Sequence, residues 1–236
     1  DYIINRKVRS CNKKKLKIIF CIGETLKEKR NGLTHKVLKK QISKGLEGVK
    51  NINGYDLITF NALRWRMLNH EKYIPYIDDW QFSLSATSRE LLDNFIKNGG
   101  KMMAFHTSSI CFDDWEGWSK LLGGKWDWDK SFHPPIETIE VSPLGNSILN
   151  KGIKKFEVND EVYHNLHIEK NSRPFLSAKS NTSKEEHIVG WTYEYQKGKT
   201  VYNALGHDTE SLKNPYMINI IEKSLLWLSG EEFAKN

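Results

Sequence analysis

The chain has 236 residues, of which 39% are hydrophobic and 11% aromatic, enough for a packed core in one large domain or two small ones. Its net charge of +7 lies largely within residues 6–50, where helical spacing favours a solvated face over a nucleic-acid footprint. No apolar run approaches the ~20 residues that span a bilayer and no leader is recognisable, so we expect a cytoplasmic protein without nucleic-acid or membrane partners.

The first predicted unit is a strand followed by a helix. Residues 17–23 form an apolar run that ends in glycine, which is typical of a buried parallel strand, and apolar residues recur with helical spacing over residues 34–49. Asn51-Ile-Asn-Gly54 is a turn signal, at which we place a domain junction. Because Asp1 stands where a methionine is usual, we interpret the chain as a fragment, a processed chain or a partial reading frame, and a lost leader remains open.

A second strand–helix series follows the junction. The pattern predicts a strand over 56–61, a helix over 88–98 and another strand over 101–106. Such alternation favours a parallel sheet with helices on both faces. Residues 64–86 are long, aromatic and irregular, which is typical of a functional loop or lid.

The last hundred residues change to short segments of alternating character. Gln196-Lys-Gly-Lys199 indicates a hairpin turn, and residues 210–228 predict a closing amphipathic helix. The predicted strands cover residues 138–141, 156–158, 174–178, 188–195 and 200–205.

The N-terminal residues resemble a known barrel enzyme. Leu16–Thr34 and Gln41–Val49 are similar to one strand and helix of triosephosphate isomerase, over about a fifth of the chain. The barrel needs eight such units, and the family's catalytic lysine, histidine and glutamate motifs have no counterparts in this sequence. We therefore expect no isomerase activity, although a label of triosephosphate isomerase could arise from this fragment.

Residues of about 55–230 resemble the ThuA-like (trehalose utilisation) family, because several blocks agree in order and spacing. The resemblance implies an open, mainly parallel α/β sheet, flavodoxin-like and related to class I glutamine amidotransferases. The blocks are Tyr55–Phe60, Leu92–Ser109, Asp114–Trp118, Leu121–Gly124, Ser131–Pro134, Phe156–Tyr163, Gly190–Tyr195, Gly198–Tyr202 and Ala204–Asp208.

The start of the chain departs from that family. A strand, loop, helix and second strand normally precede the Tyr55 block, and the isomerase-like piece stands in their place. We divide the chain into residues 1–53, an isomerase-like fragment, and residues 54–236, a ThuA-like domain. A fused or misassembled reading frame is the favoured explanation; alternatively, the borrowed strand and helix fill the vacant edge of the sheet.

Three polar residues are expected where parallel strands end. Ligands of open α/β sheets bind at the carboxyl ends of the strands, where Asn61, His106 and His207 fall. His106 stands where related amidotransferases place a nucleophilic cysteine. Ser108 and Cys111 lack the glycines of a nucleophile elbow, so we expect no amidotransferase chemistry. The three cysteines are too sparse for a disulfide framework, which favours a reducing cytoplasm.

Histidines and carboxylates supply the candidate chemistry. Neutral imidazole serves as a general base or a metal ligand, so we expect catalysis by His106 and His207, assisted by Asp160 or Glu161. A divalent metal such as zinc, held by His106, His133 and His207, is a weaker prediction because no short ligand motif is present. The plainer alternatives are strand-end histidines bonded to backbone, solvated or capping acids, and a His133 that only shapes its loop.

Aromatic residues complete the predicted site. Tryptophan faces suit the C–H faces of a pyranose, although core packing is the commoner role. One tryptophan of Trp126-Asp-Trp-Asp129 could line a sugar site while the other anchors the loop, and we treat His35, His70, His167 and His187 as ordinary histidines. The predicted substrate-binding residues are Asn61, Trp115, His133, Tyr163 and Trp191.

The hypothesis from sequence is a protein of trehalose or related disaccharide utilisation that acts on a sugar or keto-sugar. Its expected partner is a small carbohydrate, and its oligomeric state is open. A non-catalytic carbohydrate-binding module is the first alternative, and a degenerate product of a fused frame is the second.

Overall fold

The computed structural model describes residues 18–22, 52 and 54–230. Strand β1 (Ile18–Ile22) forms as predicted, whereas the helix expected over residues 34–49 lies outside the described residues. β1 pairs in parallel with β2 (Leu57–Asn61), with Ile18 opposite Leu57 and Ile22 opposite Asn61. The backbone of β1, which lies within the isomerase-like stretch, therefore forms one edge of the main sheet.

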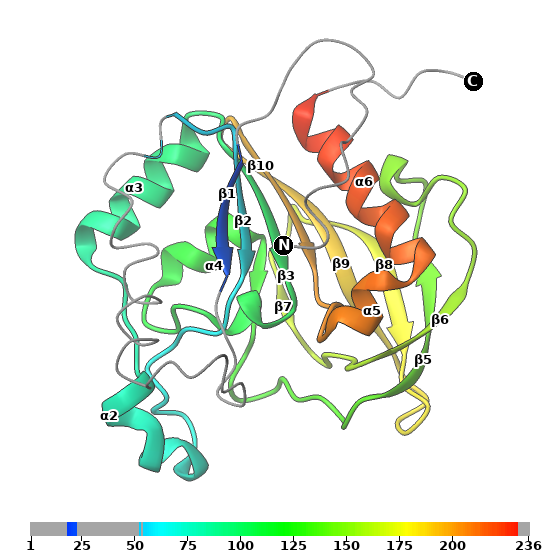
Figure 1. The fold of residues 1–236 in the computed structure, drawn as a ribbon, viewed down its shortest axis with the longest axis horizontal. Coiled ribbons are helices and arrows are strands. Elements are labelled where there is room, and N and C mark those ends of the chain that lie inside the picture. The colour runs from blue at the N-terminus through cyan, green and yellow to red at the C-terminus, as the bar shows by residue number, and fades with distance from the viewer. Residues whose placement is uncertain (1–17, 23–51, 53, 231–236) are drawn as a thin grey trace, which may run out of the picture.

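The main sheet has eight strands in the order β1-β2-β3-β10-β9-β8-β5-β6 (Figure 1). Neighbours from β1 to β10 pair in parallel, and every pairing from β10 to β6 is antiparallel. The predicted α/β fold is confirmed, and its sheet is mixed, parallel in one half and antiparallel in the other. The remaining strands are β3 (Lys101–Phe105), β5 (Glu137–Pro143), β6 (Phe156–Asp160), β8 (Arg173–Lys179), β9 (Glu186–Tyr195) and β10 (Gly198–Asn203), with β4 (Gly124–Lys125) and β7 (His167–Ile168) forming a small antiparallel sheet.

Helices lie on both faces of the sheet, as predicted. In Figure 1, α3 (Ala86–Lys97) and α4 (Glu116–Leu122) lie on one side and α6 (Pro215–Ser229) on the other. The Ser85 side chain caps α3 by accepting from Ser88 N, as expected at a helix start. α4 ends at Gly123 (φ 79°), where an added Cβ would lie 2.6 Å from Tyr193.

The predicted closing helix over 210–228 is divided in two. Pro215 has no N–H to continue the preceding helix, so α5 (Thr209–Lys213) ends before it, and Asn214 caps the start of α6. The shorter elements are the 3₁₀ helices η1 (Glu71–Tyr76), η2 (His106–Ile110) and η3 (Ile148–Asn150), together with α2 (Ile77–Trp80).

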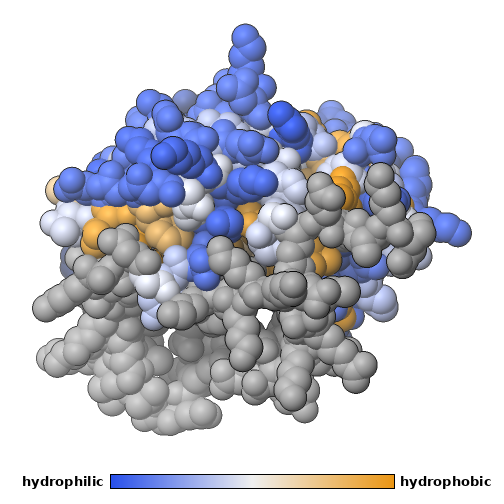
Figure 2. Space-filling view, turned by 90° about the horizontal axis from the view of Figure 1, so that it is seen from above, coloured by the Kyte–Doolittle hydropathy of each residue, from blue (hydrophilic) through white to orange (hydrophobic). Residues whose placement is uncertain are grey.

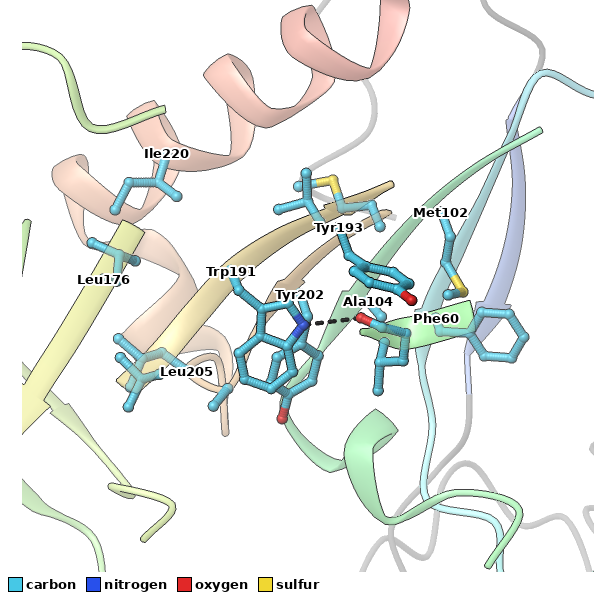
Figure 3. Close-up of a cluster of buried hydrophobic side chains, with 14 of the residues drawn as sticks. Phe60, Met102, Ala104, Leu176, Trp191, Tyr193, Tyr202, Leu205 and Ile220 are labelled. Carbon is cyan, nitrogen blue, oxygen red and sulfur yellow. Dashed lines mark hydrogen bonds between the residues drawn. The ribbon is translucent and has the colours of Figure 1, made fainter. Parts of the chain in front are cut away.

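The core joins the two halves of the sheet (Figure 3). Phe60 and Met102 come from the parallel half, Leu176 from the antiparallel half and Ile220 from α6, and all four are buried. Full burial of such a side chain contributes ~1.5–3 kcal/mol. This continuous core fixes the strand ends that carry the polar residues described next.

The side of the molecule that lies at the top in Figure 1 is mainly hydrophilic in its described residues (Figure 2). Within the part of the chain that is described, no helix combines the length and apolar character needed to cross a bilayer.

A shallow hollow lies at the start of β2 and β3. It contains none of the predicted site residues, and it is lined by Tyr55, Asp56, Phe95, Asn98, Gly99, Gly100 and Lys101.

Candidate functional site

His106 lies at the sharp turn between β3 and η2. Its φ of 45° is left-handed, a conformation that costs a non-glycine residue ~1–3 kcal/mol and persists only when its surroundings hold it. Two interactions do so: Tyr202 Oη donates to the His106 carbonyl at 2.7 Å, and His106 Nδ1 lies 2.9 Å from Ala204 O. The strained turn places the imidazole at the carboxyl edge of the parallel strands.

The surroundings of His106 fix its tautomer. A carbonyl oxygen only accepts, so Nδ1 carries the proton towards Ala204 and Nε2 presents its lone pair. Burial lowers the pKa of His106 to about 4, which keeps the ring neutral near pH 7. Tyr163 Oη donates to Nε2 at 3.1 Å, and burial raises the pKa of this phenol, so it stays protonated.

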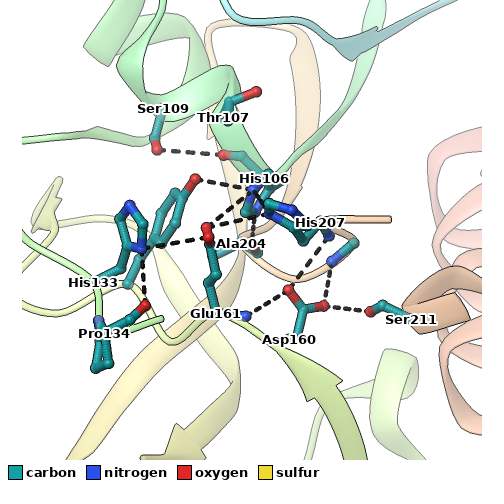
Figure 4. A network of polar contacts seen from close by, with 12 residues as sticks. His106, Thr107, Ser109, His133, Pro134, Asp160, Glu161, Ala204, His207 and Ser211 are labelled. Atoms are coloured by element: carbon teal, nitrogen blue, oxygen red, sulfur yellow. Dashed lines mark hydrogen bonds and ion pairs between the residues drawn. The ribbon is translucent and has the colours of Figure 1, made fainter. Parts of the chain in front are cut away.

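Glu161 and His207 meet His106 at that nitrogen (Figure 4). His207 Nδ1 lies 3.2 Å from His106 Nε2, and Glu161 Oε2 lies 3.5 Å from His106 Nε2 and 3.3 Å from His207 Nδ1. The His207 side chain is 35% exposed, so the group opens towards solvent on that side. We call His106, Glu161, His207 and Tyr163 the histidine centre.

Asp160 supports the histidine centre from behind. Its buried carboxylate accepts from Glu161 N at 2.8 Å, Gly206 N at 2.7 Å and His207 N at 3.3 Å, and also from Ser211 Oγ. Burial raises the pKa of Asp160 in spite of these donors. Of the two predicted carboxylates, Glu161 therefore faces the histidines, while Asp160 holds the backbone that carries them.

The histidine centre has the donor geometry of a metal site. Zinc bound tetrahedrally at ~2.0–2.1 Å holds its ligand atoms ~3.3 Å apart, and the three separations among His106, Glu161 and His207 are 3.2–3.5 Å. His133, predicted as a ligand, is not in this set: its Nδ1 lies 3.0 Å from Pro134 O and 3.5 Å from Glu161 Oε1. The structure thus replaces His133 by Glu161 in the group that fits a cation.

The predicted substrate-binding residues separate into two groups. Tyr163 belongs to the histidine centre, and the His133 ring packs 5.5 Å from it between centroids. Trp191 is fully buried in the core and donates to Leu122 O, which corrects its predicted role. Trp115 packs on Trp118 and beside Arg89. Asn61 ends β2, the strand next to β3, but takes part in none of the hydrogen bonds described for the centre.

Trp126 also lies beside the histidine centre, although it is not among the predicted substrate-binding residues. Its ring packs 5.1 Å from Tyr163 and 6.1 Å from His133 between centroids. Its buried indole N–H has no hydrogen-bond partner. The Trp126-Asp-Trp-Asp129 pattern had marked this loop, with Trp128 further out, stacked 6.5 Å from Trp65.

Both candidate nucleophiles of the turn are buried and contact backbone oxygens. Burial raises the pKa of Cys111 to about 12, and its Sγ lies 3.1 Å from Ala62 O. Ser108 is also buried, with Oγ donating to Phe60 O. A high pKa and burial keep the Cys111 thiol protonated, so it is a poor nucleophile in this position.

Comparison with known families gives one extended match. A model of the ThuA family, described as trehalose utilisation, matches residues 16–228. The match begins inside the stretch that resembles triosephosphate isomerase. Because it extends to residue 228, the match also includes every residue of the histidine centre.

Two solved structures have the same fold over nearly the whole chain. A ThuA-like protein from Parabacteroides merdae superposes with a TM-score of 0.67 at 15% identity, covering 94% of this chain and 93% of that one. A ThuA-like protein from Bacteroides uniformis gives a TM-score of 0.59 at 12% identity, with coverages of 95% and 97%. Identities this low establish the fold alone.

The curated relatives match only a short segment. Triosephosphate isomerase of Thermodesulfovibrio yellowstonii is 52% identical over 46 residues, which is 20% of this chain and 19% of that enzyme. The chain thus spans about a fifth of the length of the curated relatives it matches.

Proposed function

Since this chain belongs to the ThuA family of trehalose utilisation, we propose that it acts on a sugar or keto-sugar from trehalose or a related disaccharide through its histidine centre. The observation that carries the proposal is the convergence of two imidazole nitrogens and one carboxylate oxygen within 3.5 Å at the carboxyl ends of the strands. Ligands of open α/β sheets bind at this edge.

The centre offers a base and a donor side by side. Glu161 accepts a proton from a sugar hydroxyl or an acidified C–H, and His207, partly exposed beside it, passes that proton to solvent. When a sugar is bound, the Tyr163 phenol turns from His106 Nε2, to which it donates in the free protein, to the sugar oxygen that becomes negative. A divalent cation such as zinc fits the same three ligand atoms and would polarise that oxygen when bound.

Trp126 supports a carbohydrate as the substrate class. A buried indole N–H without a partner costs ~1–3 kcal/mol, which a sugar hydroxyl would recover by accepting from it. Its ring, packed on Tyr163 and beside His133, supplies an apolar surface of the kind that pyranose C–H faces contact.

Turnover of trehalose and its keto derivatives by the full chain tests the proposal. We expect Glu161→Gln to lower kcat/KM by ~10²–10⁴-fold, because the proton acceptor is lost while the shape is kept. Glu157→Gln is the matched control, because Glu157 is exposed on β6 and four residues from Glu161. Unchanged turnover in Glu161→Gln would remove the assigned role.

A non-catalytic carbohydrate-binding module is the second candidate, favoured by the unpartnered indole of Trp126. It predicts saturable binding of the same sugars with no turnover by the wild-type chain, and that result would replace the enzyme proposal. Isomerase activity is not favoured, because the matched segment is only 19% of the isomerase.

A further inference from the structure

A second histidine cluster consists of His164, Glu185 and His187, and it begins at the residue that follows Tyr163 of the histidine centre. The consecutive residues Tyr163 and His164 have different neighbours: the Tyr163 ring packs on His106 at 4.8 Å, whereas the His164 ring stacks on His187 at 3.8 Å between centroids. His187 is the second residue of β9, and Glu185 lies in the turn just before that strand. The segment after β6 thus separates two groups of titratable side chains.

The buried ring nitrogens of this cluster make no hydrogen bond, and one of them faces a carboxylate. His164 is fully buried, yet neither of its ring nitrogens makes a hydrogen bond. His187 Nε2 is also buried without a hydrogen bond, and its nearest acid is Glu185 Oε2 at 3.5 Å. Because each unsatisfied buried polar group costs ~1–3 kcal/mol, native proteins seldom leave them so. The Phe132 ring packs against His164 in a tilted arrangement, 4.5 Å away between centroids, but offers no oxygen or nitrogen acceptor.

Two imidazoles and a carboxylate are ligands that zinc-type cations prefer. One ligand atom from each of His164, Glu185 and His187 lies within 4.8 Å of the others. Glu185 is exposed, which leaves the cluster open to an ion from solvent.

We propose that His164, Glu185 and His187 form a second divalent transition-metal site, of zinc type, with water as the fourth ligand. Imidazole lone pairs lie in the ring plane, and the two rings are stacked with 27° between their planes, so zinc binding requires one ring to rotate until the ligand atoms lie ~3.3 Å apart. The bound ion ties the β8–β9 turn to the segment that carries Glu161 and Tyr163. Its role is structural, because none of its three ligands belongs to the histidine centre.

The test counts zinc on the full chain after chelator treatment and re-addition of Zn²⁺, with the zinc-dependent rise in Tm as a second readout. We expect His187→Ala to lose one equivalent of zinc and most of that rise, and Glu185→Gln to weaken binding at least tenfold. Glu185 is exposed on a turn, so this variant keeps the fold intact. His167→Ala is the matched control, since His167 pairs with Glu169 at 3.7 Å but is not part of a three-ligand group.

A His207→Ala variant separates the two clusters. An equivalent of zinc that His187→Ala loses and His207→Ala keeps belongs to the second cluster. Any equivalent that only His207→Ala loses belongs to the histidine centre. The proposal is overturned if the wild-type chain takes up no zinc, if His187→Ala keeps the full complement, or if only His207→Ala loses metal.

Discussion

The two histidine clusters use the same residue types but differ in how their nitrogens are satisfied. In the histidine centre, His106 bonds to Ala204 O through one nitrogen and to Tyr163 through the other. In the second cluster, His164 has no partner for either nitrogen. The comparison teaches that the histidine centre is held in place by the protein alone, whereas the second cluster lacks a component that a ligand would supply.

Among these variants, removal of the Asp160 carboxylate should cause the largest loss in the free energy of unfolding. Asp160→Ala leaves three backbone N–H groups and the Ser211 hydroxyl buried without an acceptor, so we expect a loss of roughly 3 kcal/mol in the free energy of unfolding. Urea denaturation with chelator present measures it. The control Glu157→Ala, on the exposed face of the same strand, should change stability by less than about 0.5 kcal/mol. A cost below about 1 kcal/mol for Asp160→Ala would refute the idea of a self-supporting centre.

The next largest effect should be the contribution of the buried, neutral His106 ring to the pH dependence of stability. Its folded pKa of about 4 lies below the unfolded value of 6.5, so the unfolded chain binds the proton more tightly between these values. Stability from this group is therefore full above pH 6.5 and is lost as the pH falls towards 4. Between pH 7 and pH 5 the wild type should lose about 2 kcal/mol more than His106→Asn in urea denaturation with chelator present.

Comparing the two pH profiles removes the contribution of groups that both proteins share. Parallel profiles for the wild type and His106→Asn would show that His106 is not buried in its neutral form. The histidine centre would then differ less from the second cluster than the structure indicates.

The smallest expected effect comes from His164. His164→Phe removes two unpartnered nitrogens and keeps an aromatic ring against Phe132, so without zinc we expect stability within about 1 kcal/mol of the wild type, or a gain. His106→Phe should cost more, because it strands Ala204 O and the Tyr163 hydroxyl. Calorimetry of both variants compares them directly, and equal costs would mean that His164 has partners after all.

Much of the fold was predictable because periodicity reports burial locally. The strand predicted over 56–61 is Leu57–Asn61, the helix over 88–98 is Ala86–Lys97, and the hairpin turn falls between β9 and β10. The break at Pro215 was readable from its missing N–H, although the helical pattern runs across it. The antiparallel half agrees with the short alternating segments, whereas its place within one continuous sheet depends on long-range pairing that no local pattern encodes.

The candidate site was predictable in its residue types and less so in its pairings. The rule that ligands bind at strand ends brought His106 and His207 together correctly. Adjacent acids are indistinguishable by spacing, so only the backbone donors around Asp160 show that Glu161 is the one facing the histidines. His187 was interpreted as ordinary because its stacking partner, His164, is 23 positions away in the sequence, beyond the reach of any motif.

Strand β10 has a consequence for how the protein folds. It pairs in parallel with β3 on one side and antiparallel with β9 on the other, and Ala204, the acceptor for His106, follows directly after it. Residues 106, 161 and 207 are distant in the sequence, so their assembly must close long loops, which is the slow part of folding. The histidine centre can form only after β10 has docked between the two halves, so its appearance during refolding would report the completion of the native topology.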